Sequence, residues 1–388
     1  MNLALPIAVP ARTGPQRRAR RRYGDWSTAA LMLPAVLRCD GRSLWFAVVA
    51  CGIAATVATF QFAVFTSFLA AGSAAPRYLG ADAWITDRGI ECFDFPTALA
   101  DGYRGALLAE LPGARFERVV VGFTAWISPT GERGNVALIG HDGAGLGPHE
   151  FRADRSDLKR LQLDRGAREA SIGGVAVDLA GTTDRLATFL GAPYVEMTYD
   201  TAHAVLGYPV DATAYLAVRF PNGAPADLPE RLRRLEHRFP EISAHTGDGF
   251  AASSSSYWQN KTGAGAAILL AAILASLLMV LLLVNSVGRF VQRRQADIVS
   301  MLGHGASAAQ IRNLLLAMAG FLIATSLALA VVLVPLTTVV AQPWLPWVSF
   351  KLVDAFFAEV IAVMCLVASL IVAQRELERF PADAVFRS

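Results

Sequence analysis

Four long stretches of the chain carry no Asp, Glu, Lys or Arg. They run from Leu44 to Gly72, Thr262 to Gly288, Asn313 to Phe350 and Val360 to Ala373. A helix of about 20 apolar residues spans the hydrocarbon core of a bilayer. The pattern therefore predicts transmembrane helices at residues 43–72, 263–288, 313–341 and 354–374, with an outer loop at 342–353. Core helices of a soluble protein would rarely give three uncharged runs this long.

The distribution of arginine predicts the orientation of these helices. Arginines cluster before Leu44, between the second and third stretches and after the fourth, whereas the loop between the third and fourth has only Lys351. The positive-inside rule then places both termini and residues 289–312 in the cytoplasm. Residues 73–262 lie outside, and Ser73 to Lys261 carries 19 basic and 24 acidic residues. The formal charge of +3 thus comes from cytoplasmic segments, which removes the support for nucleic-acid binding.

The N-terminal region is not an ordinary cleaved signal, because its polar part is long and the first apolar run exceeds the 7–15 residues typical of a signal peptide. Residues 1–24 are rich in Arg and Pro and predict a disordered basic cytoplasmic tail. Residues 25–42 predict an amphipathic helix at the inner interface. The run Arg17 to Arg22 is interpreted as a contact with anionic membrane lipids. Residues 375–388 form a cytoplasmic tail.

The sequence pattern of the outer segment, residues 73–262, is typical of a domain with both helices and strands, and the segment is large enough to have its own core. Strands are predicted at 114–128, 134–140, 175–179 and 214–220, where β-branched and aromatic residues gather. Helices are predicted at 96–111, 201–206 and 228–239. Residues 251–262 are expected to be a polar lead-in to the second span, with Tyr257 and Trp258 at headgroup level. The fold class is an α-helical membrane protein with four transmembrane helices and an α+β extracytoplasmic domain inserted between helices 1 and 2.

The cytoplasmic segment 289–312 predicts a short helix between two spans. Ala296 to Leu302 has helical spacing, Gly303 and Gly305 interrupt it, and Ser307 can cap the helix that continues into the third span. Such an element could dock on a nucleotide-binding protein and couple its motion to the membrane. The alternative is a plain helical hairpin loop without a partner.

Catalytic and cofactor motifs are missing from the sequence. No Gly-x-x-x-x-Gly-Lys-Ser/Thr occurs, and none of the three lysines, Lys159, Lys261 and Lys351, follows a glycine. The chain is therefore not expected to bind ATP or to be an enzyme, and ATP with Mg²⁺ belongs to a separate subunit. The spacing of the four cysteines fits no zinc or redox motif. His141-Asp142 invites a hydrolase or metal interpretation, yet beside two glycines it is more typical of a turn.

The segment from Val287 to Phe321 resembles the cytoplasmic loop of the FtsX/MacB permease superfamily. That loop has an R-E-x-A-x-L-x-A-L-G-A-S pattern followed by an Ile-Arg-containing helix. The matching positions are Gln295, Ala296, Ile298, Met301, Leu302, Gly303, Gly305, Ala306, Ser307, Gln310, Ile311 and Arg312. Asp297 carries the charge that the family usually has earlier, and His304 replaces a usual Ala. Residues 379–387 resemble the family's P-x-x-x-L-R ending.

The outer segment is similar to DevC-like permeases, whose pattern is L-G-A-D-x-W-V, then N-F, then V-P-G-V. The corresponding residues here are Leu79 to Ile85, Phe93 and Leu111 to Ala114, and Gly140-His141-Asp142 matches a common G-x-D. The resemblance implies a homodimeric permease of an ABC-type exporter in the bacterial inner membrane, which relays the motion of an ABC ATPase to the outer domain. It further implies a periplasmic adaptor (membrane-fusion) protein, an outer-membrane channel and a lipid-like or small hydrophobic cargo.

The residues that the resemblance assigns to ATPase coupling are Ala296, Ile298, Val299, Met301, Leu302, Gly303, Gly305, Ser307, Gln310, Ile311 and Arg312. Two other functions remain open on the sequence. One is an FtsX-like transmembrane signal transducer that activates an extracytoplasmic cell-wall hydrolase. The other is a membrane-anchored enzyme, which only the His141 region favours.

Overall fold

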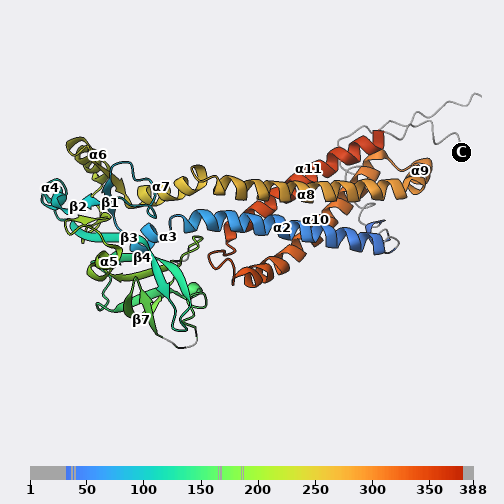
Figure 1. Ribbon diagram of the computed structural model, residues 1–388. Coiled ribbons are helices and arrows are strands. Elements are labelled where there is room, and N and C mark those ends of the chain that lie inside the picture. The colour runs from blue at the N-terminus through green and yellow to red at the C-terminus, as the bar shows by residue number, and fades with distance from the viewer. Residues whose placement is uncertain are drawn as a thin grey trace, which may run out of the picture. The chain divides into compact units, whose positions relative to one another are not determined.

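The computed structural model describes residues 32–35, 38, 41–164, 166, 168–184, 186 and 188–378 (Figure 1). The predicted tail at 1–24 and most of the predicted interfacial helix at 25–42 lie outside the described residues. The rest falls into two compact units. One contains the chain up to Phe60, Ala272–Pro335 and the chain from Leu352, and the other contains Gln61–Ala271 and Leu336–Lys351.

Within the described residues, four helices are long and apolar enough to cross a membrane. They are α2 (Gly41–Ala71), α8 (Ala264–Arg293), α10 (Ala308–Ala341) and α11 (Leu352–Glu378). A helix rises about 1.5 Å per residue, so each exceeds the roughly 30 Å of a bilayer core. The prediction of four membrane-length helices is confirmed. All four extend beyond the uncharged runs: α2 begins at Gly41, α8 continues to Arg293, α10 begins at Ala308, and α11 runs from Leu352 to Glu378.

All strands of the described chain lie between α2 and α8 in the sequence. The large sheet has the order β11-β1-β10-β3-β4-β8-β5-β7-β6. Its strands are β1 (Ala83–Asp87), β3 (Arg115–Ile127), β4 (Arg133–His141), β5 (Glu150–Asp154), β6 (Glu169–Ile172), β7 (Val175–Thr183), β8 (Tyr194–Thr198), β10 (Tyr215–Arg219) and β11 (Ile242–Thr246). The predicted strands at 114–128, 134–140, 175–179 and 214–220 correspond to β3, β4, β7 and β10.

The sheet closes on itself because β6, at its end, also pairs with β3. The strands β3, β4, β8, β5, β7 and β6 form this ring, and β10, β1 and β11 extend from it. Side chains alternate between the faces of a strand, and β3 shows the result. Val120 and Trp126 belong to the core cluster with Phe151, whereas Val119 and Val121 face a second cluster.

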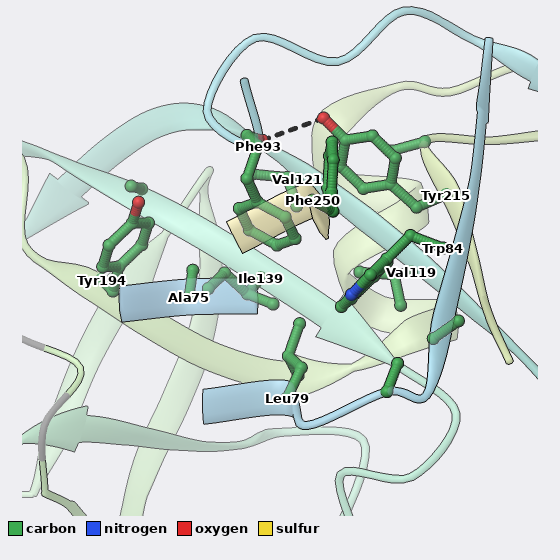
Figure 2. Packing of buried hydrophobic residues seen from close by; sticks show 14 of the residues in the cluster. Ala75, Leu79, Trp84, Phe93, Val119, Val121, Ile139, Tyr194, Tyr215 and Phe250 are labelled. Atoms are coloured by element: carbon green, nitrogen blue, oxygen red, sulfur yellow. Dashed lines mark hydrogen bonds between the residues drawn. The ribbon is translucent and has the colours of Figure 1, made fainter. Parts of the chain in front are cut away.

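The strands outside the ring are buried on both faces. On β1, Trp84 joins one core cluster while Ala83 and Ile85 join another. Figure 2 shows the first cluster, where Trp84, Phe93, Tyr215 and Phe250 pack with ring centroids 5.2–6.4 Å apart. The opposite face is covered by leucines of two helices, α4 (Arg104–Glu110) and α6 (Leu228–Arg238).

One sequence prediction in this domain is wrong. Of the predicted helix at 96–111, only α4 is α-helical, and β2 (Leu99–Ala100) pairs with β9 (Ala212–Thr213). Thr97 Oγ1 donates to Asp87 Oδ2 at 2.6 Å, which also holds this stretch extended. The predicted lead-in at 251–262 is mostly helical, within α7 (Gly247–Asn260), which α8 follows in the sequence. The predicted helices at 201–206 and 228–239 correspond to α5 (Tyr199–Leu206) and α6.

The start of α7 depends on a glycine. Gly247 N donates to Asp82 O at 2.8 Å, and a Cβ at this position would lie 2.1 Å from the backbone oxygen of Ala81. We expect Gly247→Ala to lower the free energy of unfolding by about 1–3 kcal/mol, because a backbone must shift. Denaturant titration of the detergent-solubilised chain, followed by tryptophan fluorescence, measures this change.

Gly105→Ala is the matched control, because Gly105 lies in α4 and a Cβ there meets nothing within 4 Å. It should leave stability unchanged or raise it by roughly 0.5 kcal/mol, since alanine favours a helix. Equal stabilities of the Gly247→Ala chain and the unmodified chain would contradict the close contact with Ala81.

Candidate functional site

The segment between α8 and α10 contains a short helix, α9 (Gln295–Gly303), whose C-terminal end is closed by hydrogen bonds. Gly305 N donates to Leu302 O at 3.0 Å, and Ala306 N donates to Met301 O at 3.0 Å. Gly305 has φ +93°. This pair of bonds around a left-handed glycine is the Schellman motif, which satisfies carbonyl groups that a helix end leaves open. The predicted break at Gly305 is confirmed, whereas the break predicted at Gly303 is wrong, because α9 includes Gly303.

The beginning of α10 is closed in a reciprocal way. Gln310 N donates to Ser307 Oγ at 3.2 Å, and Ser307 N donates to Gln310 Oε1 at 2.9 Å. This is a capping box, and it confirms that Ser307 caps the helix of the third predicted span. We call residues 294–312, from the end of α8 into α10, the α9 connection. Its two turns are fixed by hydrogen bonds on both sides of Ala306.

The residues predicted to couple to an ATPase differ in exposure. Ile298 and Ile311 are 2% exposed and therefore pack inside the protein. The half-buried residues are Val299, Met301, Leu302, Gln310 and Arg312, and the exposed ones are Ala296, Gly303, Gly305 and Ser307. Ser300 is also exposed and lies one helical turn from Ala296. A partner could touch Ala296 and Ser300, whereas Ile298 can act only by holding α9 in place. The coupling role itself stays a prediction.

The second region of interest lies in the other unit, where the domain meets the ends of the membrane-length helices. Phe189, from the loop before β8, packs against Phe68 of α2 at 4.5 Å and Trp258 of α7 at 4.8 Å between ring centroids. Trp347, from the loop before α11, lies 6.2 Å from Phe189. We call these four aromatic residues the membrane-end cluster. They join α2, α7, the outer loop and the domain through one apolar contact.

Backbone groups reinforce the membrane-end cluster. Ser255 Oγ of α7 donates to Leu69 O of α2 at 2.9 Å. Ser67 Oγ donates to Ser349 O at 3.0 Å and accepts from Ser349 N at 3.1 Å. The end of α2 is thus bonded both to the helix that leads into α8 and to the loop that leads into α11.

Asp94 is a buried carboxylate beside this cluster. Its side chain accepts from Trp258 Nε1 at 2.9 Å, from Cys92 Sγ at 3.6 Å and from the Tyr194 hydroxyl. Burial raises the pKa of Asp94, and the three donors oppose that rise. The side chain of Trp258 is 9% exposed and donates to Asp94, so it is held inside the domain, and its predicted position at headgroup level stays a prediction.

Glu196, in the middle of β8, is a second buried carboxylate. It is 1% exposed, its Oε1 lies 2.7 Å from His141 Nε2, and its Oε2 accepts from Tyr78 at 3.0 Å and from Arg152 at 3.2 Å. Burial alone would raise the pKa of Glu196, but the contact with His141, together with Tyr78 and Arg152, lowers it. Tyr78 belongs to α3 (Ala74–Leu79), which directly follows α2 and packs against α7.

The His141-Asp142 pair has structural partners rather than a catalytic arrangement. His141 ends β4 and bonds to Glu196, while Asp142 in the next turn pairs with Arg118 at 2.8 Å. Arg118 also stacks over the Tyr199 ring at 4.0 Å. Within the described residues, no group of three or more His, Cys, Asp and Glu could hold a metal ion. The turn interpretation of this pair is confirmed.

A large open cavity of about 1380 Å³ lies beside α3 on the same unit. It is lined by the end of α2, by α3, by the start of α7 and by the loop before α11, including Ser67, Tyr78, Asp248 and Trp347. We call it the membrane-side cavity. Its walls belong to the same elements that Asp94 and Glu196 hold together, so a movement of these helices would change its shape.

Sequence reasoning missed Asp94, Tyr194, Glu196 and Tyr78. Glu196 could have been recognised from the sequence, because it is the one charged residue in the otherwise apolar and aromatic stretch from Tyr194 to Met197. A carboxylate in a buried strand needs hydrogen-bonding partners. The identity of these partners depends on the pairing of distant strands and could not be deduced from one sequence.

These features define a multi-pass membrane protein with a large α/β domain. No protein-family model matches the chain, and no curated protein matches it. Among solved structures, the periplasmic region of MacB from Actinobacillus actinomycetemcomitans is similar, with 10% identity and a TM-score of 0.34, covering 44% of this chain and 92% of that one.

Two further structures are similar in part. The extracellular domain of the noncanonic ABC-type transporter YknZ from Gram-positive bacteria has 9% identity and a TM-score of 0.30, covering 43% of this chain and 99% of that one. A domain of a permease protein from Porphyromonas gingivalis has 16% identity and a TM-score of 0.27, covering 42% of this chain and 85% of that one.

The lowered pKa of Glu196 predicts an acid-dependent loss of stability. A carboxyl group with a lower pKa in the folded state stabilises the fold above its ordinary pKa, and this contribution is lost as the pH falls. We expect the free energy of unfolding to decrease as the pH falls below the ordinary value of 4.5. In Glu196→Gln this part of the pH dependence should be absent, and stability at pH 7 should fall by about 3 kcal/mol.

Denaturant titrations between pH 3.5 and pH 7 measure both effects on the detergent-solubilised chain. Glu169→Gln is the control, because Glu169 is exposed at the start of β6. It should keep the stability within about 0.5 kcal/mol of the unmodified chain and preserve its acid dependence. A Glu196→Gln chain as stable at pH 7 as the Glu169→Gln chain would refute the role of the buried carboxylate.

Proposed function

We propose that the chain is the permease subunit of an ABC-type exporter, which relays the motion of a separate ATPase to its extracytoplasmic domain. The observation that carries the proposal is the α9 connection. A short helix with a fixed end lies between two membrane-length helices, within a segment that resembles the cytoplasmic loop of FtsX/MacB permeases. An element that transmits force must keep its shape when it is pushed, and the hydrogen bonds around Gly305 and Ser307 provide this.

The ATPase would contact the exposed side of α9, at Ala296 and Ser300. The sequence has no phosphate-binding loop, so ATP and Mg²⁺ are bound by that partner. Ile298 is buried in the compact unit that contains Ala272–Pro335, and Asp297 pairs with Arg294 at 2.7 Å. A push on the exposed side of α9 would therefore pass to α8 and α10, the helices that α9 joins.

The outer domain would receive this motion through helix ends. α2 continues into α3, whose Tyr78 bonds to Glu196 in the sheet. α7 leads into α8, and its Trp258 bonds to Asp94. Because each of these helices is held by a buried polar contact as well as by aromatic packing, a displacement of α2 relative to α8 would deform the domain around the membrane-side cavity.

The resemblance to DevC-like permeases supplies the remaining parts of the proposal. Two copies of the chain would each bind one ATPase. α8 presents a continuous apolar exposed face of Ile273, Leu274, Leu277, Leu278 and Leu281, which suits contact with lipid or with a second copy of the chain.

A lipid-like or small hydrophobic cargo would pass to a periplasmic adaptor protein and an outer-membrane channel. The membrane-side cavity is the space we propose for its release.

The docking surface on α9 can be tested with Ala296→Trp. The residue is exposed, so a bulky side chain should block the ATPase without disturbing the fold. After co-expression with the ATPase encoded next to this chain, we expect the amount that co-purifies to fall at least about tenfold, which corresponds to about 1.4 kcal/mol. ATPase activity of the purified complex in nanodiscs should fall in parallel.

Ala266→Trp is the matched control, because Ala266 is exposed near the opposite end of α8. It should retain the ATPase at the level of the unmodified chain. If the unmodified chain retains no ATPase, the permease proposal fails. If both variants retain the ATPase fully, the docking surface lies elsewhere than α9.

A further inference from the structure

A cavity of about 610 Å³ opens among the three helices α2, α8 and α10. Its lining on α8 ends at Arg293, directly before the α9 connection in the sequence. It is lined by Arg42, Ser43, Leu44, Phe46, Ala47 and Ala50 of α2, by Leu282, Asn285, Ser286, Arg289, Phe290 and Arg293 of α8, and by Met318 of α10. All of these residues belong to one compact unit. The volume falls within the roughly 300–1,000 Å³ of small-molecule sites.

The polar end of this cavity has an unbalanced positive charge. Three arginines, Arg42, Arg289 and Arg293, contribute to its wall, and no Asp or Glu does. Among the described residues, Arg42 and Arg289 form no ion pair, while Arg293 donates to Ser43 Oγ. Guanidinium groups bind phosphate through paired hydrogen bonds, so these arginines, which have no acidic partner among the described residues, form a complementary surface for a phosphate group.

The other end of the cavity is apolar. Ala47, Ala50, Leu282 and Met318 line it, whereas Phe290 lies between Arg289 and Arg293 in the sequence of α8. These residues lie on helices of membrane length. The cavity is thus amphipathic along the helix direction, with arginines where the uncharged runs begin or end and apolar side chains within those runs.

We propose that this cavity binds one anionic phospholipid of the membrane leaflet on the arginine-rich side. The lipid phosphate would contact Arg42, Arg289 and Arg293, with Asn285 available for a remaining headgroup oxygen, since the Ser286 hydroxyl already donates to Leu282 O at 2.7 Å. An acyl chain would lie along Ala47, Ala50 and Leu282. Basic pockets between membrane helices on the cytoplasmic side are a recognised class of anionic-lipid site.

The apolar half of the cavity selects a lipid over a free phosphate ion. A soluble anion would use only the arginines and would leave the apolar wall open to water, whereas a lipid covers both parts. The inference goes beyond the proposed permease function, because lipid binding requires neither the ATPase nor α9. If the Ala296→Trp experiment contradicts the permease proposal, the lipid proposal is unaffected. If the lipid experiment contradicts the lipid proposal, the permease proposal is likewise unaffected.

The test uses the purified full chain after delipidation in detergent, with native mass spectrometry as the readout. Phosphatidylglycerol and phosphatidylcholine of the same chain length are the probes. We expect phosphatidylglycerol to bind at least about tenfold more tightly than phosphatidylcholine. The double variant Arg289→Ala and Arg293→Ala should lose this preference, since each arginine near an anionic headgroup contributes to affinity.

Arg375→Ala is the control for the loss of an arginine outside the cavity, because Arg375 is exposed on α11 and does not line the cavity. It should keep the preference for phosphatidylglycerol. A second variant, Ala50→Trp, fills the apolar end and should weaken phosphatidylglycerol binding while all three arginines remain. Because it removes no charge, it also tests the site if the double variant does not fold.

Three outcomes would overturn the proposal. One is equal binding of the two lipids, and another is an equal loss in Arg375→Ala and in the double variant, which would indicate a general charge effect. The third is full displacement of phosphatidylglycerol by millimolar inorganic phosphate together with unchanged binding in Ala50→Trp, which would indicate a site for a free anion. Retention of the preference only where the cavity is intact supports the lipid site.

Discussion

The β-sheet domain depends on two carboxylates that are buried where helices meet the sheet. A carboxylate that leaves water must recover hydrogen bonds inside the protein, and Asp94 and Glu196 recover theirs from different elements. Asp94 draws donors from α7, β8 and the Cys92 turn, while Glu196 draws them from α3, β4 and β5. If α3 or α7 moved away alone, a buried charge would lose a partner, so the helix ends and the sheet are constrained to move together.

The membrane-length helices could be predicted because the bilayer imposes a simple requirement on composition. Every backbone group in the hydrocarbon core must be bonded within the segment, and the side chains must be apolar. The α9 connection was also predictable, because glycine at Gly305 and serine at Ser307 have local conformational roles that need no distant partner. What could not be predicted is that Ile298 faces inward and Ala296 outward, since this depends on the packing of α9 against other helices.

The domain shows where a single sequence gives too little information. β3 and β4 are long and rich in β-branched residues, whereas β8 is five residues long and has Glu196 at its centre. No helix was predicted at α7, because its serines have low helix propensity. In the fold these serines bond to other elements: Ser253 donates to Glu91 O, Ser255 donates to Leu69 O, and Ser254 accepts from Phe93 N. Tertiary contacts outweigh the local preference.

The closed ends of α9 have a consequence for the kinetics and thermodynamics of association. A loop that must become ordered on binding loses conformational entropy, and this loss reduces the affinity that its contacts could give. The turns at Gly305 and Ser307 are already fixed in the folded chain. The loss of conformational entropy has therefore occurred during folding and does not reduce the binding affinity. A protein that docks on α9 meets a preorganised surface. Even a small interface there can therefore bind measurably, and complex formation need not wait for the segment to fold.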